Sequence, residues 1–141
     1  MSKYKNSKVV ADGVTFDSKH EALYYELLKR KRAEGKIQNF ELQPKYILQP
    51  SFKRDGKTVR AITYTADFLV YHTDGTEEVV DIKSIGTATQ QGLIRRKMFW
   101  YQFPDMKLTW LCRSLKHGDT DGWVEYETLK SIYAKGRRKG D

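Results

Sequence analysis

The sequence predicts a single α/β domain with a central mixed β-sheet flanked by helices, and three observations lead to this fold class. The chain has 141 residues, which is the size of one domain. Hydrophobic residues make up 39% of it and aromatic residues 13%, enough for a buried core. Helix-like and strand-like segments follow in the order helix, three strands, helix, strand and a further helix, with no linker long enough to divide residues 1–141.

The first third of the chain predicts a hairpin, a helix and a strand. Residues 9–16 predict a short hairpin with an Asp-Gly turn. A helix is predicted from about Ser18 to Glu34, closed by the glycine that follows. Ser18 and Glu21 have capping-box spacing, and apolar residues at helical spacing after Glu21 place it beside the buried face. Residues 37–48 predict an extended strand that runs into prolines, typical of an edge or irregular element.

The middle of the chain predicts an antiparallel pair of strands. Residues 53–57 predict a polar turn, followed by a long strand over residues 59–71. An Asp-Gly turn then leads into a return strand over residues 77–83. This hairpin joins two apolar runs, and the rest of the chain is organised around it, so we call it the central hairpin.

The last third predicts a helix, a strand and a final strand and helix. A helix is predicted over about residues 88–102, opened by Thr87 and Gln90 as a second capping box and ended by a proline. Residues 106–112 predict a buried strand. A short strand and a last helix are predicted from Trp123 onward.

The net positive charge of the chain indicates which class of partner it binds. Lys and Arg outnumber Asp and Glu by 26 to 18, which gives a formal charge of +8 and a pI near 9.5, typical of proteins that bind nucleic acids or anionic membranes. No apolar run approaches the roughly 18 residues of a membrane span, and the first residues lack the apolar stretch of a signal peptide. We therefore expect nucleic acid to be the partner, with a basic N-terminal arm (1–8) and a basic C-terminal tail (136–141).

Several other site classes have no support in the sequence. The single cysteine, Cys112, permits neither an intrachain disulfide nor a cysteine-rich zinc site. The three histidines show no HExxH spacing and no serine in a nucleophile-elbow context. Neither a P-loop nor a GxGxxG motif is present, so no nucleotide cofactor is expected.

Two acids interrupt the apolar runs of the central hairpin. Asp67 and Asp81 lie inside them, where a carboxylate is costly to bury without compensation. Lys83 follows Asp81 by two residues, so both side chains lie on one face of the strand. Two carboxylates and an ammonium on one sheet are the groups of a metal-dependent phosphodiesterase site.

The acid-x-lysine spacing alone is a weak signal. Five such triplets occur: Asp17–Lys19, Glu34–Lys36, Asp55–Lys57, Asp81–Lys83 and Asp105–Lys107. Four of them lie at predicted turns or helix ends, where exposed acids and lysines are expected. Only Asp81–Lys83 lies in a β-branched apolar run beside a strand with its own embedded acid.

The register of the hairpin decides whether the two acids meet. A two-residue turn would place Asp67 and Asp81 on opposite faces of the sheet. A three-residue loop over residues 73–75, with Gly75 in the left-handed conformation, would place them opposite each other, and we expect this second register. Because two facing carboxylates repel each other, this register favours a cation between them.

Magnesium fits this arrangement. Mg²⁺ prefers oxygen ligands and keeps several waters, so we predict Asp67, Asp81 and the backbone carbonyl of Ile82 as its ligands, with Mn²⁺ able to substitute. Glu21 is expected to join directly, through water, or by helping to hold a second ion. Lys83 is expected to contact the phosphate and stabilise its developing negative charge.

Each residue also has an ordinary structural interpretation. Glu21 could serve only the capping box, and Asp67 could hydrogen-bond backbone at a strand end. Asp81 and Lys83 could form a simple ion pair. The combination in one basic protein favours the nuclease interpretation.

With these residues placed, the chain resembles the PD-(D/E)XK nuclease superfamily over about residues 12–112. The resemblance rests on FDSKHEALYYELL with Glu21, YTADF with Asp67, and VVDIKS with Asp81 and Lys83. With the ELQP segment, these pieces most resemble small phage and prophage endonucleases related to Holliday-junction resolvases. One departure is the alanine before Asp67, where the superfamily pattern has proline.

The resemblance implies an αβββαβ restriction-endonuclease-like core. It also implies metal ligands at Asp67 and Asp81, a contributing acid at Glu21, a catalytic lysine at Lys83, and products with a 5′-phosphate. The predicted function is a Mg²⁺-dependent, structure-selective endodeoxyribonuclease that cuts branched DNA as a homodimer, in the bacterial host cytoplasm if a phage encodes it. The alternatives are a DNA-binding module that does not cleave, and an end-processing or sequence-selective nuclease of the same superfamily.

Basic residues outside the hairpin are the candidates for DNA contacts. Arg95, Arg96 and Lys97 on the second helix come first. Behind them stand Lys29, Arg30, Arg137, Arg138 and Lys139. An exposed, solvated helix face is the competing interpretation for each of them.

Overall fold

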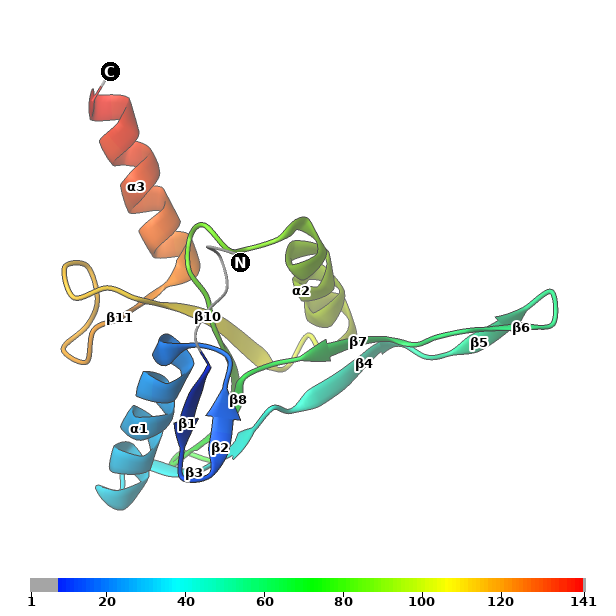
Figure 1. The fold of residues 1–141 in the computed structure, drawn as a ribbon, viewed down its shortest axis with the longest axis horizontal. Coiled ribbons are helices and arrows are strands. Elements are labelled where there is room, and N and C mark those ends of the chain that lie inside the picture. The colour runs from blue at the N-terminus through cyan, green and yellow to red at the C-terminus, as the bar shows by residue number, and fades with distance from the viewer. Residues whose placement is uncertain (1–7, 141) are drawn as a thin grey trace.

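The computed structural model describes residues 8–140, with side chains as far as residue 137, and contains a five-stranded mixed sheet. Its strands are β3 (Ile37–Leu42), β8 (Phe68–His72), β9 (Glu77–Ile82), β10 (Lys107–Arg113) and β11 (Trp123–Glu125). They lie in the order β11-β10-β9-β8-β3, and only the β9–β10 pair is parallel (Figure 1). The predicted α/β fold is confirmed, whereas all but the last residue of the predicted N-terminal arm lies outside the described residues.

Three helices flank the sheet: α1 (Lys19–Ala33), α2 (Gln90–Gln102) and α3 (Tyr126–Gly140). On one face, Leu28 of α1 packs in a cluster with Phe68 and Val80. On the other face, Phe99 of α2 shares a cluster with Val79, and α3 packs against β10. None of the helices in the described residues is long and apolar enough to span a membrane.

The N-terminal hairpin and α1 form as predicted. β1 (Val9–Ala11) and β2 (Val14–Phe16) pair around the Asp-Gly turn and lie against α1. Ser18 caps α1 by accepting a hydrogen bond from the backbone N–H of Glu21 at 3.1 Å. Gly35, with φ of 75°, ends the helix in the left-handed conformation that glycine adopts without strain.

Helix α2 begins later than predicted. Thr89 is its cap, accepting a hydrogen bond from the N–H of Gly92 at 3.0 Å. The hydroxyl of Thr87 instead lies 2.7 Å from the hydroxyl of Ser84 in the preceding loop. The prediction of Thr87 as the cap is therefore wrong, because the loop engages its side chain.

The structure divides two of the predicted strands. Their outer parts form a two-stranded segment over residues 44–66, which we call the β-arm. The first predicted strand is interrupted at Gln43, which has a φ of 51°, and at Pro44, which has no backbone N–H to donate to the sheet. Strand β4 (Lys45–Gln49) therefore runs in a different direction from β3. β4 pairs with β7 (Ile62–Thr65), and β5 (Phe52–Arg54) pairs with β6 (Lys57–Val59). The resulting two-stranded ribbon projects from the body of the molecule (Figure 1).

The register of the central hairpin is the predicted one. Phe68 pairs with Val80, and the N–H of His72 donates to the carbonyl of Thr76 at 2.9 Å. The loop between them has three residues, and Gly75 has a φ of 90°. Continued by one residue, this register sets Asp67 opposite Asp81.

Candidate active site

The candidate site lies at the end of two central strands, where β8 begins and β9 ends. Asp67 immediately precedes β8, and Asp81 is the penultimate residue of β9. The N–H of Asp67 donates to Oδ1 of Asp81 at 2.8 Å, and the N–H of Ile82 donates to Oδ2 of Asp67 at 2.8 Å. These reciprocal hydrogen bonds fix the two carboxylates at the same end of the hairpin.

Both aspartates lie in surroundings that disfavour their charge. Asp81 is only 4% exposed. Burial, together with the charges of Asp81 and Glu21, raises the pKa of Asp67 to about 8. Burial also raises the pKa of Asp81, although the Tyr64 hydroxyl and the charge of Lys83 act in the opposite direction. A cation bound between the two carboxylates would favour their charged forms.

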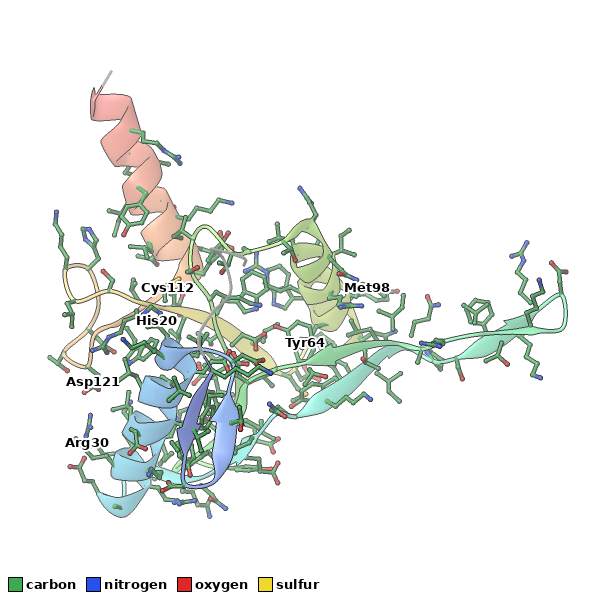
Figure 2. The ribbon with its side chains drawn as sticks, viewed as in Figure 1. His20, Arg30, Tyr64, Met98, Cys112 and Asp121 are labelled. Carbon is green, nitrogen blue, oxygen red and sulfur yellow. The ribbon has the colours of Figure 1, made fainter. Side chains whose placement is uncertain are left out.

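Tyr64 and Trp110 also contact the aspartate pair, and neither residue is predicted from the sequence. Tyr64 is 5% exposed and lies at the base of the β-arm (Figure 2). Its hydroxyl donates a hydrogen bond to Oδ2 of Asp81. The same hydroxyl accepts a hydrogen bond from Nε1 of Trp110 at 2.8 Å. Burial and the nearby Asp81 charge raise the pKa of Tyr64 well above its ordinary value, so it remains a donor. Only the tertiary fold reveals this group: the parallel register pairs Trp110 with Asp81, and the buried indole N–H finds its acceptor in Tyr64.

Lys83 lies close to the acids. Its Nζ is 4.8 Å from the centre of the Trp110 ring, and its backbone N–H donates to the carbonyl of Leu111 at 2.8 Å. Its charge lowers the pKa of Glu21, Asp67 and Asp81 against the larger opposing effect of burial. Because Lys83 forms no salt bridge with a described residue, its ammonium remains available to an anion.

Glu21 lies in the first turn of α1, near enough for its charge to interact with Asp67 and Asp81. Burial raises its pKa, and the charges of Asp17 and Asp81 act in the same direction. Within residues 8–140, however, no three His, Cys, Asp or Glu side chains lie close enough together to hold a metal ion. The side-chain donors that the reciprocal hydrogen bonds bring together are two carboxylates, Asp67 and Asp81, and the Ile82 carbonyl stays a predicted third ligand. This set fits Mg²⁺, which commonly binds one or two carboxylates and keeps several waters.

A small cavity of about 140 Å³ adjoins Lys83 on the side of α1 and α3. Its lining includes His20, Ser84 and Arg113. Burial, then the charges of Arg113 and Lys19, lower the pKa of His20. The positive charge around this cavity suits a phosphate group beside Lys83.

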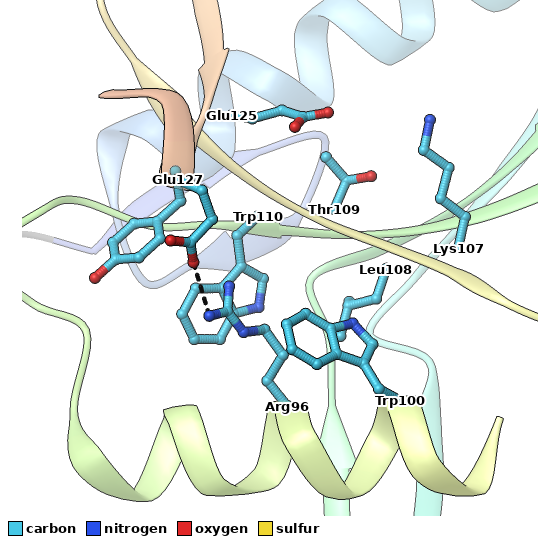
Figure 3. Close-up of a pocket in the computed structure, with 9 residues that line it drawn as sticks. Arg96, Trp100, Lys107, Leu108, Thr109, Trp110, Glu125 and Glu127 are labelled. Atoms are coloured by element: carbon cyan, nitrogen blue, oxygen red, sulfur yellow. Dashed lines mark hydrogen bonds and ion pairs between the residues drawn. The ribbon is translucent and has the colours of Figure 1, made fainter. Parts of the chain in front are cut away.

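Arg96, predicted to contact DNA, is used inside the protein instead. Its side chain is 12% exposed and forms a salt bridge with Glu127 of α3 at 2.7 Å. The guanidinium lies 4.7 Å from the ring centre of Trp100 and 4.1 Å from that of Trp110, in a cavity of about 290 Å³ (Figure 3). Arg96 therefore joins α2 to α3, and the geometry does not support a DNA contact for it.

The remaining basic candidates differ in availability. Lys29 is held by Asp12 at 2.5 Å and Glu26 at 3.1 Å. Arg30 lies 3.8 Å from Asp121, at the end of α1 opposite Glu21 (Figure 2). No salt bridge within the described residues involves the other candidates whose side chains are described: Arg95, Lys97 and Arg137. The side chains of Arg138 and Lys139 lie outside the described part of the chain.

Comparison with known proteins gives a family but no activity. A family model described as "Protein of unknown function (DUF1064)" matches residues 1–119. Searches of curated proteins and of solved structures found no significant match. Any function must therefore be argued from the site itself.

Proposed function

The chain belongs to the DUF1064 family, and we propose that it is a Mg²⁺-dependent endodeoxyribonuclease. The observation that carries the proposal is the Asp67–Asp81 pair. Two enclosed carboxylates with raised pKa values face each other at the end of two central strands, an arrangement that a divalent cation would stabilise. Clusters of perturbed acids in such positions are typical of functional sites.

The side chains around the pair suit phosphodiester hydrolysis. Mg²⁺ held by Asp67, Asp81 and the Ile82 carbonyl would polarise the phosphate and activate a water. Lys83 supplies an ammonium that can neutralise charge on the phosphate oxygens. Glu21, in the first turn of α1, can position a water, and Tyr64 orients the Asp81 carboxylate through its hydroxyl.

DNA is the proposed substrate because the chain carries a formal charge of +8. The resemblance to PD-(D/E)XK nucleases supports the same substrate. Branched DNA is the preferred form, and a homodimer is proposed because two symmetric cuts across a junction need two active sites.

A DNA-binding module that does not cleave is the second candidate. It is favoured by one observation: within residues 8–140 no three potential ligand side chains come together as a metal cage. Such a protein would bind DNA with or without divalent ions.

The decisive test is a cleavage assay with four-way junction and linear duplex DNA, each end-labelled, in Mg²⁺, Mn²⁺ or EDTA. We expect wild type to cut the junction faster than the duplex, only with a divalent ion, and to leave a 5′-phosphate. Asp81→Asn and Lys83→Ala are expected to be inactive. The proposal fails if wild type cuts nothing, or if both variants cut at the wild-type rate. Cleavage that starts from the ends of linear DNA would favour an end-processing nuclease. Cleavage of linear duplex at one particular sequence would favour a sequence-selective nuclease.

A further inference from the structure

The β-arm, residues 44–66, has two halves with different surroundings. In the inner half, Leu48 and Tyr64 are buried in a cluster with Phe99 of α2. Gln102 of α2 also donates a hydrogen bond to the carbonyl of Leu48 at 2.8 Å. In the outer half, every residue from 50 to 60 is exposed. The outer half thus projects from an anchored base.

The core does not explain this outer half. An isolated two-stranded hairpin with neither face buried is at best marginally stable in water. Phe52 and Val59, which pair across the ribbon, remain 44% and 37% exposed. Binding of a partner that covers this segment would therefore stabilise it.

Charge indicates the chemistry of that partner. The β-arm carries five basic residues and one acid, Asp55, a net charge of +4 out of the chain's +8. Four of the basic residues lie on the outer half: Lys53, Arg54, Lys57 and Arg60. None of the four forms a salt bridge with a described residue. Lysine on a strand edge also prevents aggregation, but charges of either sign would serve that purpose, whereas here one sign dominates.

The shape of the ribbon fits double-helical DNA. Arg54 pairs with Lys57 across a two-residue turn in which Asp55 and Gly56 both have positive φ, 52° and 75°. This is a type I′ turn, whose twist matches that of the strands. The major groove, about 12 Å wide, admits a two-stranded β-ribbon, with phosphates along both walls.

We propose that the β-arm binds duplex DNA, with its outer half in the major groove and its four basic side chains on the flanking phosphates. The inference takes DNA as partner from the proposed function but does not depend on cleavage. Strand β7 leads within two residues to Asp67, and Tyr64 contacts Asp81. The strand that carries the proposed DNA contacts is therefore continuous with the one that leads into the candidate site.

The test is fluorescence anisotropy with a labelled duplex of about 30 base pairs, in EDTA, over 50–200 mM NaCl. The arm variant combines Lys53→Gln, Arg54→Gln, Lys57→Gln and Arg60→Gln. The matched control changes net charge equally by replacing four exposed lysines with glutamine: Lys36, Lys116, Lys130 and Lys135. We expect the arm variant to bind at least about tenfold more weakly at 0.1 M NaCl, with a slope of log K against log salt lower by about 3. We expect the control to stay within about threefold of wild type.

Three results would overturn the inference. In the first, the arm variant and the control lose equal affinity. In the second, wild type binds no duplex. In the third, sedimentation without DNA shows a wild-type dimer that the arm variant cannot form, which would make the β-arm an interface between copies. If the binding result holds and wild type still cleaves nothing, the proposed nuclease activity fails while the β-arm inference stands.

Discussion

Strand β9 carries two enclosed carboxylates, and they have opposite electrostatic surroundings. Glu78 accepts hydrogen bonds from the hydroxyl of Thr109 at 2.5 Å and pairs with Nε2 of His72 at 2.8 Å, with Lys107 at 3.7 Å. Burial raises its pKa, but these partners outweigh burial and lower it overall. Asp81, three residues later, faces a second carboxylate, and the pKa values of both are raised.

This difference separates a structural carboxylate from a functional one. Glu78 has cationic and hydroxyl partners within the protein, so its charge is already compensated. The Asp67–Asp81 pair has neutral backbone and tyrosine donors, with Lys83 as the nearest compensating charge. The remaining charge imbalance suits an external cation, and it costs stability until one binds.

The largest expected effect is on catalysis. Asp67→Asn should lower the rate of DNA cleavage at least about a thousandfold, because it removes a carboxylate ligand at the reacting centre. Glu78→Gln, an equally conservative change on the same strand, should leave the rate within about threefold. Both rates are measured on junction DNA in Mg²⁺ with protein whose folding has been checked by circular dichroism. Equal losses in the two variants would show that the two carboxylates do not differ in role.

The second effect is on stability and has opposite signs at the two carboxylates. In EDTA at pH 8, Asp67→Asn should stabilise the protein by at least about 2 kcal/mol, because it removes a charge that the fold disfavours. Glu78→Gln should destabilise it by about 1–2 kcal/mol, because charge-assisted hydrogen bonds are lost. Urea unfolding measures both values.

The pH dependence of the stability gained by Asp67→Asn tests whether the raised pKa of Asp67 is its cause. The folded pKa of Asp67, about 8, lies above the ordinary value of 3.8. Between these values the unfolded chain releases its proton while the folded protein keeps it, so stability falls as pH rises from about 4 to about 8. Asp67→Asn lacks this loss, so its advantage over wild type should grow across that interval and level off above it. An advantage independent of pH would contradict the assignment.

The sequence predicts those parts of this site that rest on local signals. Ser18 and the glycine after the helix define α1, and the Asp74-Gly75 turn sets the register that brings Asp67 and Asp81 together. A turn residue and a two-residue alternation are readable without knowledge of the tertiary fold.

Long-range contacts could not be predicted in this way. Trp110 donates a hydrogen bond to Tyr64, 46 residues away in the sequence, and nothing in either segment predicts this contact. The sequence does not predict the β-arm. Hydrophobic alternation indicates that a segment is extended, but it does not indicate where that segment leaves the sheet. The partners of Arg96 within the protein are likewise not predicted, because charge does not report burial, although Trp100 four residues later indicates stacking along the helix.

A third, smaller effect is stabilisation by metal. Wild type should gain about 1 kcal/mol of unfolding free energy when free Mg²⁺ is fivefold above its Kd, since binding to the folded state alone stabilises it. Glu78→Gln should keep this gain, and Asp81→Asn should lose it. Thermal unfolding with and without Mg²⁺ at constant ionic strength measures it. An equal gain in Asp81→Asn would place the ion elsewhere.

The smallest expected effect concerns Tyr64, which acts through Asp81. Tyr64→Phe keeps the ring in its cluster with Phe99 but removes the hydroxyl that lowers the pKa of Asp81. The cleavage rate at neutral pH should fall about threefold to fivefold, and the acidic limb of the pH–rate profile should move to higher pH, because Asp81 then holds its proton longer. Tyr46→Phe is the matched control, since Tyr46 also packs on Phe99 and its hydroxyl bonds to no described residue. A loss of rate without movement of the acidic limb would assign Tyr64 a purely packing role. Movement of the limb in Tyr64→Phe alone would show that the hydroxyl holds Asp81 in its charged form, as the lysine and hydroxyl partners do for Glu78 at the other end of the strand.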